Sequence, residues 1–179
     1  MSIELWIGPM FAGKTSRLLC KARRYAVQNK KVLYLKKKVD TRYDASCIVT
    51  HDLWKEDAHV VTFLSELPVS IDDYDVIAID EGQFFPELKV VADKWASQGK
   101  IVLVSALNCD YQRRGFQSVL QLVAIAEKVH SLSAICIQCY GEAHYTHKIK
   151  TKETIKRIEI GGEELYEPRC RACFLSCIE

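Results

Sequence analysis

The sequence predicts an α/β fold: a parallel sheet flanked by helices, followed by a small cysteine-tied domain. Three observations predict it. Apolar strand-like runs alternate with segments whose apolar residues recur at helical spacing, and this alternation favours right-handed crossovers between parallel strands. The first run leads into the pattern G-x-x-x-x-G-K-[ST], the phosphate-binding loop (P-loop). Two C-x₂-C pairs near the C-terminus have the spacing of a zinc site.

Length and composition limit the domain organisation. The 179 residues are enough for one full domain with a small appendage, and a 49% apolar content supplies a core. The alternation stops near residue 134. We therefore expect a P-loop α/β nucleotide-binding domain over residues 1–133 and a zinc-ribbon-like domain over residues 134–179.

Charge and hydropathy argue against several function classes. A net charge of +2 gives no electrostatic argument for binding nucleic acid or a membrane. No run of 18 apolar residues is present, and Met1–Leu5 carry no cationic stretch of a secretory signal. We expect a cytoplasmic protein, in which the eight cysteines are reduced thiols or metal ligands.

The residues Gly8–Thr15 are predicted to bind a nucleoside triphosphate. Ile3–Ile7 reads as a buried strand before them, and apolar residues recur at helical spacing over 18–26. In that context the N–H groups of the loop cradle phosphate oxygens. Lys14 would reach the β- and γ-phosphates, and the Thr15 hydroxyl would ligate Mg²⁺. The alternative is a turn that holds no ligand. The predicted ATP-binding residues of the loop are Gly8, Pro9, Met10, Phe11, Ala12, Gly13, Lys14 and Thr15.

The next predicted strand is Val32–Leu35, apolar throughout as expected when helices cover both faces of a sheet. The loop after it contains Asp40 and Arg42, candidates for contacts to phosphate or to Mg²⁺-bound water. Surface turn residues are an equal alternative there. Ile48–His51 and His59–Thr62 could form short strands.

A second motif is an apolar strand that ends in two acidic residues. Tyr74–Ile79 leads directly into Asp80 and Glu81. A carboxylate beside a P-loop holds Mg²⁺ and its waters, so we assign Asp80 to magnesium. Glu81 would point toward the γ-phosphate and accept a proton from the group that attacks phosphorus. An exposed acidic turn is the alternative.

The alternation continues toward the C-terminus. Gly82–Pro86 reads as a turn, with Pro86 at the first position of a helix that Gly99 ends. The remaining predicted elements are a strand at Lys100–Leu107, a loop at Asn108–Gln117, a helix at Val119–Lys128 and a closing strand at Val129–Leu132.

The paired cysteines predict a structural zinc site. Two C-x₂-C pairs separated by 30 residues can place four thiolates around Zn²⁺. Two disulfides are one alternative, and Cys177, His144 or His147 could replace a ligand. A domain this small needs metal to fold, and its natural place is over the cleft as a lid. The four predicted zinc ligands are Cys136, Cys139, Cys170 and Cys173.

In combination the motifs resemble the cytosolic, zinc-containing thymidine kinase family, over nearly the whole chain as far as Cys173. The residues that carry the resemblance are Gly8–Thr15, Asp80–Phe85, Gln112-Arg113 with Phe116, the C-x₂-C pairs, and Ile160–Gly162 before Tyr166.

The resemblance implies transfer of the ATP γ-phosphate to the 5′-hydroxyl of thymidine or deoxyuridine, with Glu81 as the proton acceptor. It also implies that Arg42 contacts the phosphates. A loop of residues 134–179 that is held in place by the zinc site, called the lasso, would enclose the base. A homotetramer and feedback inhibition by thymidine triphosphate (dTTP) are further implications. The implied substrate-binding residues are Met10, Phe84, Leu107, Tyr111, Phe116, Thr146, Arg157, Ile158, Glu159, Ile160, Gly161 and Tyr166.

Two other readings compete with this one. A nucleic-acid-linked ATPase would use Glu81 to activate water, but 179 residues leave little room for a second motor domain. The charge balance also shows no excess of basic residues that would bind the phosphates of a nucleic acid. A zinc-ribbon binding module with a vestigial nucleotide site predicts damage to the P-loop or to the acidic strand end, and both are intact.

Overall fold

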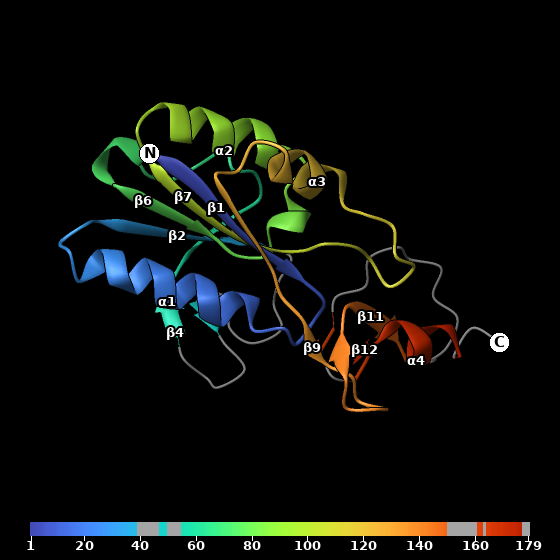
Figure 1. The fold of residues 1–179 in the computed structure, drawn as a ribbon. Helices are drawn as coiled ribbons and strands as arrows, with labels where there is room; N and C mark the ends of the chain where they lie inside the picture. Colours follow the sequence, from blue (N-terminus) through green and yellow to red (C-terminus); the bar gives the residue numbers. More distant parts are fainter. Residues whose placement is uncertain (39–46, 50–54, 150–160, 163, 177–179) are drawn as a thin grey trace.

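A six-stranded sheet, parallel throughout, forms the centre of the protein (Figure 1). The computed structural model describes residues 1–38, 47–49, 55–149, 161–162 and 164–176. The predicted α/β class is confirmed. In spatial order the strands are β5 (His59–Val61), β2 (Val32–Lys37), β6 (Val76–Ile79), β7 (Ile101–Leu107), β1 (Ser2–Gly8) and β8 (Lys128–Ser131).

Helices cover both faces of the sheet, which explains why its central strands are continuously apolar. α1 (Lys14–Ala26) lies on one face, and α2 (Leu88–Ser97) and α3 (Gln117–Val123) lie on the other (Figure 1). The side chains of β6 alternate between the two layers. Ile77 and Ile79 belong to the larger core under α2 and α3, whereas Val76 and Ala78 belong to the smaller core under α1.

The other elements are short. Two 3₁₀ turns and three antiparallel strand pairs accompany the main sheet, and a fourth helix follows the last strand. They are η1 (Ile71–Asp73) and η2 (Gly82–Phe84), β3 (Cys47–Val49) with β4 (Lys55–Asp57), β9 (Ala134–Ile135) with β10 (Glu142–Ala143), β11 (Tyr145–Lys148) with β12 (Tyr166–Arg169), and α4 (Arg171–Leu175).

Predicted boundaries differ from the structure in two helices, and α3 also begins at Gln117, two residues before the predicted Val119. α3 ends at Val123 and not at Lys128, because Lys128 already pairs with Glu4 as the first residue of β8. α2 begins at Leu88, two positions after Pro86, and Glu87 precedes it with its carboxylate accepting a hydrogen bond from the Leu64 N–H at 2.7 Å. In both cases a contact to a distant segment sets the end of the helix, which local sequence does not encode.

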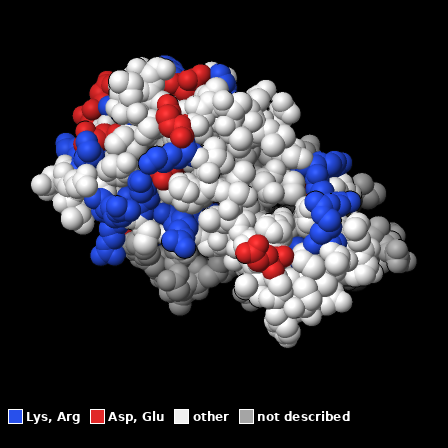
Figure 2. Space-filling model, viewed as in Figure 1, with Lys and Arg blue, Asp and Glu red and all other residues white. Residues whose placement is uncertain are grey.

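The segment from β9 to α4, here called the cysteine module, lies beyond the C-terminal ends of the sheet strands (Figure 1). Lys and Arg side chains gather in separate groups on the face drawn in Figure 2, one on the side of α1 and another on the side of the cysteine module. No helix in the described part of the chain has the length and apolar content needed to cross a bilayer.

A buried carboxylate joins β1, α1 and the edge strand β8. Glu4 is 7% exposed, and its oxygens lie 2.9 Å from Lys21 Nζ and 2.8 Å from His130 Nε2. The His130 ring stacks on Trp6 with a centroid distance of 5.2 Å. Burial raises the pKa of the Glu4 carboxyl, but the hydrogen bonds from Lys21 and His130 outweigh it and hold the pKa below the ordinary value of 4.5.

This cluster predicts a pH-dependent contribution to stability. A carboxyl whose pKa is lowered by folding stabilises the protein above its unfolded pKa, and the effect disappears as the pH falls through the folded pKa. Glu4→Gln is therefore expected to lower the free energy of unfolding by about 1–3 kcal/mol at pH 7. Denaturant unfolding should show this loss shrinking below pH 4.5. Glu66→Gln, at an exposed position, is the control, and a loss that is constant with pH would contradict the assignment.

Candidate functional site

The two motifs meet at the C-terminal edge of the sheet. Asp80 directly follows β6, and its Oδ1 accepts a hydrogen bond from the Thr15 hydroxyl at 3.0 Å. Ser105 of β7 donates its hydroxyl to the same oxygen. Asp80 is 5% exposed, and these donors offset the cost of burying its carboxylate. A hydroxyl and a carboxylate are thus held together beside the first turn of α1, and both supply the oxygen ligands that Mg²⁺ prefers.

The loop between β1 and α1 has a backbone that requires glycine at its first position. A Cβ added at Gly8 would lie 2.5 Å from the Leu132 carbonyl oxygen, which is a backbone atom that cannot move aside. Gly13 caps α1 with φ 72° and ψ 22°, in the left-handed region that glycine adopts without strain. Lys14 folds back over the loop, and its Nζ donates to the Pro9 carbonyl at 2.6 Å.

Glu81 follows Asp80 in an uncommon backbone conformation. Its φ of 54° and ψ of 44° are left-handed, and it immediately precedes η2. The two adjacent carboxylates have different hydrogen-bond partners. Asp80 meets Thr15 and Ser105, whereas Glu81 Oε2 accepts a hydrogen bond from the Gln83 side-chain amide. A non-glycine residue in such a strained position is a frequent feature of functional sites.

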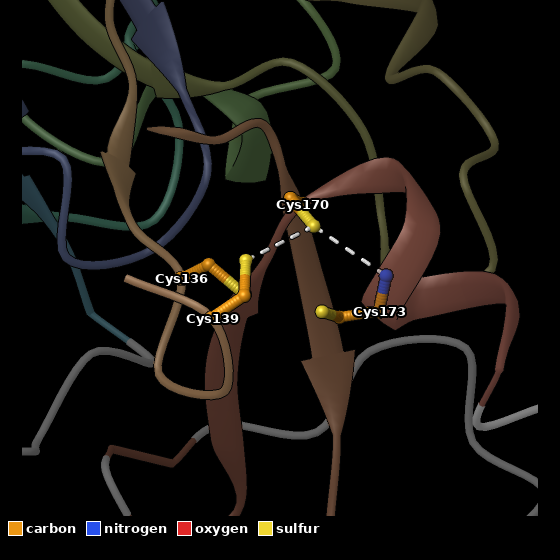
Figure 3. A group of neighbouring side chains, drawn as sticks. All are labelled: Cys136, Cys139, Cys170 and Cys173. Carbon is orange, nitrogen blue, oxygen red and sulfur yellow. Dashed lines mark hydrogen bonds between the residues drawn. The ribbon is translucent and has the colours of Figure 1, made fainter. Parts of the chain in front are cut away.

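The four predicted zinc ligands come together (Figure 3). Cys136 and Cys139 lie on the turn between β9 and β10, and Cys170 and Cys173 lie at the start of α4. Their sulfurs are all within 4.8 Å of one another, and Cys139 and Cys170 are 3.6 Å apart. Tetrahedral Zn²⁺ with Zn–S bonds of about 2.3 Å requires sulfurs roughly 3.8 Å apart. The group fits zinc, and the described residues contain no second cluster of this kind.

The other candidate ligands do not join this group. His147 is engaged elsewhere, with its ring edge-on to Phe174 at 5.7 Å, and His144 lies 3.7 Å from the Glu142 carboxylate. Cys177 lies outside the described residues.

The cysteine module contacts the loop between β1 and α1 directly. Thr146 of β11 is 4% exposed, and its hydroxyl oxygen accepts a hydrogen bond from the Met10 N–H at 3.0 Å. Phe11 and Ala12 pack against the small apolar cluster of Ala134, Cys136 and Ala143. Cys170 and Cys173 pack against the same cluster, so the cysteine group and residues 11 and 12 share one small core.

A cluster of cations and aromatic rings joins the loop between β7 and α3 to the module. The Arg113 guanidinium lies 5.0 Å from the Phe174 ring centroid and 5.9 Å from that of Tyr145. Arg171 lies 5.1 Å from Tyr145, and Lys148 lies 5.5 Å from Tyr111. Each such contact contributes about 0.5–1 kcal/mol when exposed. The contacts of Arg113 and Lys148 hold the loop that carries Tyr111 against the module, whereas the contact of Arg171 with Tyr145 lies within the module.

The structure places the other predicted substrate residues in several environments. Phe84 is half-buried in η2, and Leu107 ends β7 with its N–H bonded to Gln83. Phe116 is 8% exposed and packs in the main core. Tyr166 is 6% exposed and lies opposite Lys148 in the β11–β12 pair. Gly161 is buried near Leu165.

Some predicted positions lie outside the described residues. In addition, some polar side chains at the site make contacts that the sequence did not predict. The predicted residues that fall outside are Asp40, Arg42, Arg157, Ile158, Glu159 and Ile160. The contacts that were not predicted are those of Ser105, Gln83 and Arg113, although Gln83 and Arg113 belong to the motifs that carry the family resemblance. The sequence feature that could have pointed to Ser105 is a single hydroxyl residue within an apolar strand. For Gln83 it is a polar residue close to two acidic residues. Neither pattern specifies a partner by itself.

Comparison with known proteins identifies relatives of the whole chain. A family model described as thymidine kinase matches residues 1–174. The chain is 44% identical to a thymidine kinase of Amsacta moorei entomopoxvirus, over 97% of this chain and 98% of that protein. It is 41% identical to thymidine kinase 1 of Dictyostelium discoideum, over 97% and 78%, and 39% identical to the thymidine kinase of Monkeypox virus, over 97% and 96%.

The cysteine group predicts one zinc ion per chain, measured as metal content after purification without added zinc. Cys173→Ser is expected to release the metal and lower Tm by several degrees, because a structural zinc site contributes folding free energy directly. Cys20→Ser, on the exposed side of α1, should change neither quantity. A Cys173→Ser protein that retains stoichiometric zinc would contradict the assignment of that ligand.

Proposed function

The chain belongs to the thymidine kinase family, and we propose that it transfers the γ-phosphoryl group of ATP to the 5′-hydroxyl of thymidine or deoxyuridine. The observation that carries this proposal is the hydrogen bond between the Thr15 hydroxyl and the Asp80 carboxylate. It unites the P-loop and the acidic strand end at one edge of the sheet. In an open α/β sheet, ligands bind at that edge.

ATP would bind along the loop at the start of α1. The N–H groups of residue 8 and residues 10–15 and the positive end of the helix favour phosphate, and Lys14 would move from the Pro9 carbonyl to the β- and γ-phosphates. Arg42, predicted from the sequence, would add a phosphate contact. Thr15 and Asp80 would hold Mg²⁺, which neutralises charge on the triphosphate.

Glu81 would accept the proton of the nucleoside 5′-hydroxyl. An alcohol is too weak an acid to ionise beforehand, so the carboxylate orients the hydroxyl and takes its proton late in a loose transition state. The uncommon left-handed backbone of Glu81 and the separate hydrogen-bond partners of Glu81 and Asp80 support this role. The two acids can then serve nucleophile and metal independently.

The nucleoside pocket would lie between η2, the end of β7 and the cysteine module. Main-chain groups of residues 157–161 would form hydrogen bonds to the polar edge of the pyrimidine. This fixed row of donors and acceptors would reject cytosine, because the cytosine ring presents the opposite pattern of donors and acceptors. The side chains proposed to line the pocket are those of Met10, Phe84, Leu107, Tyr111, Phe116, Thr146 and Tyr166. The hydrogen bond of the Met10 N–H to Thr146 and the cation–π contact of Lys148 with the Tyr111 ring support the inclusion of Met10, Thr146 and Tyr111.

Zinc at Cys136, Cys139, Cys170 and Cys173 would fix the module over the cleft, so that residues 134–179 act as a lid for the nucleotide-binding unit formed by 1–133. Water is then excluded from phosphoryl transfer. We also propose a cytoplasmic homotetramer that dTTP inhibits, since these properties follow from the family resemblance.

A nucleic-acid-linked ATPase is the principal alternative. Its substrate would require a continuous basic surface. The cationic side chains on the described part of the face in Figure 2 form separate groups with uncharged surface between them, and the net charge is only +2. The kinase assignment is therefore favoured.

ATP consumption separates these functions. With Mg²⁺ and one added ligand at a time, ADP release is expected to rise at least ~100-fold with thymidine, because the bound hydroxyl replaces water as nucleophile. Single-stranded DNA should leave the rate at its basal level. Stimulation by DNA with no phosphorylated nucleoside would contradict the proposal.

Glu81→Gln tests the proton acceptor. The amide cannot take a proton, so kcat is expected to fall by at least ~100-fold, while the Kd of ATP, measured by calorimetry, changes less than about threefold because the phosphate contacts remain. Glu66→Gln, on the surface, should leave both constants unchanged. Turnover at the wild-type rate in Glu81→Gln would remove Glu81 from the mechanism.

A further inference from the structure

Gln83 lies between the proposed proton acceptor and the end of a central strand. Its Nε2 donates to Glu81 Oε2, and its Oε1 accepts the Leu107 N–H at 3.0 Å. The side chain is 6% exposed, so water competes little with either bond. One buried amide thus connects η2 with the last residue of β7.

The two partners leave only one orientation for this amide. The Leu107 N–H is a donor and must face the carbonyl oxygen of Gln83, which turns the NH₂ group toward Glu81. An ionised carboxylate only accepts hydrogen bonds, so the NH₂ group is the matching partner. The direction of the donor at Glu81 is therefore set by the backbone of β7 and not by solvent.

The surrounding backbone holds this arrangement tightly. A Cβ at Gly82 would lie 2.8 Å from Val104 Cγ1 and 3.2 Å from Leu88 Cδ2, so η2 approaches β7 and α2 as closely as a residue without a side chain allows. Glu81 on one side of Gly82 has left-handed φ and ψ, and Phe85 beyond the turn is fully buried. Gln83 consequently has little freedom to follow a displaced carboxylate.

We propose that Gln83 is a positioning residue, whose amide, oriented by the Leu107 N–H, holds the Glu81 carboxylate in the direction needed to accept the nucleoside proton. The inference rests on the proposed role of Glu81. Leu107 also belongs to the proposed nucleoside pocket. The Gln83 amide therefore links the position of the Glu81 carboxylate to the position of a residue that lines the pocket. A displacement of about 1 Å at a reacting group can lower a rate about 100-fold.

Gln83→Glu is the sharper variant. The new carboxylate has nearly the same shape and can still accept the Leu107 N–H, but it presents an acceptor in place of a donor to Glu81. We expect kcat to fall roughly 10- to 100-fold with KM for thymidine within about threefold of wild type, because pocket binding is retained. Gln83→Met removes both bonds and should lower kcat similarly while also raising KM. Gln98→Glu, the same change at an exposed position after α2, should alter neither constant.

A double-mutant cycle separates positioning from a structural role. Glu81→Asp retracts the carboxylate by one methylene from the Gln83 amide, so adding Gln83→Met to Glu81→Asp should lower kcat less than about twofold further. A full additional loss in the double variant, or a kcat near wild type in both Gln83 single variants, would overturn the proposal. If Glu81→Asp and Glu81→Gln both retain wild-type kcat, the proposed role of Glu81 fails first. If they lose activity and the Gln83 variants do not, only the positioning role fails.

Discussion

The hydrogen bond between the Thr15 hydroxyl and the Asp80 carboxylate is the contact on which the site depends. It joins the start of α1 to the end of β6, two segments 65 residues apart in the sequence. Only a parallel sheet brings these ends to one edge, because every strand in it finishes on the same side. A carboxylate that is 5% exposed is tolerated there because Thr15 and Ser105 both donate to it. The same side chains that are proposed to hold Mg²⁺ thus also stabilise the edge of the sheet through their hydrogen bonds.

The cysteine module extends this constraint to the opposite side of the loop. The buried apolar side chains of the described part of the module are few: a cluster of Ala134, Cys136 and Ala143, with Tyr166 and Phe174 also buried in the same segment. Burial alone cannot order so small a unit, so bound metal would supply the missing free energy. The Met10 N–H bonded to Thr146 transmits that order to the loop before α1, and Arg113 transmits it to the loop after β7 through its aromatic neighbours. The module that carries the four cysteines therefore contacts the loops on both sides of the proposed site.

Much of the fold and the centre of the site were predictable, since both rest on local patterns. Apolar runs marked the strands β1, β2, β6 and β7, and the glycine-rich octapeptide marked the turn into α1. The cysteine spacing predicted the four-sulfur group that the structure assembles. The errors were at boundaries such as the end of α3, where pairing of Lys128 with Glu4 ends the helical segment. Pairing energy with a distant strand exceeds the small helix propensity of a few residues.

By itself the sequence determined the class of the fold, the family, and the residue types that are proposed to meet phosphate, metal and an attacking hydroxyl. These depend on motifs in which neighbours along the chain are also neighbours in space. Only the tertiary structure decided how the acids are held: Ser105 against Asp80, and Gln83 between Glu81 and the Leu107 N–H. Those contacts follow from the order β6–β7–β1 and from the register between the strands. Strand order arises from packing of the whole chain, and no local pattern encodes it.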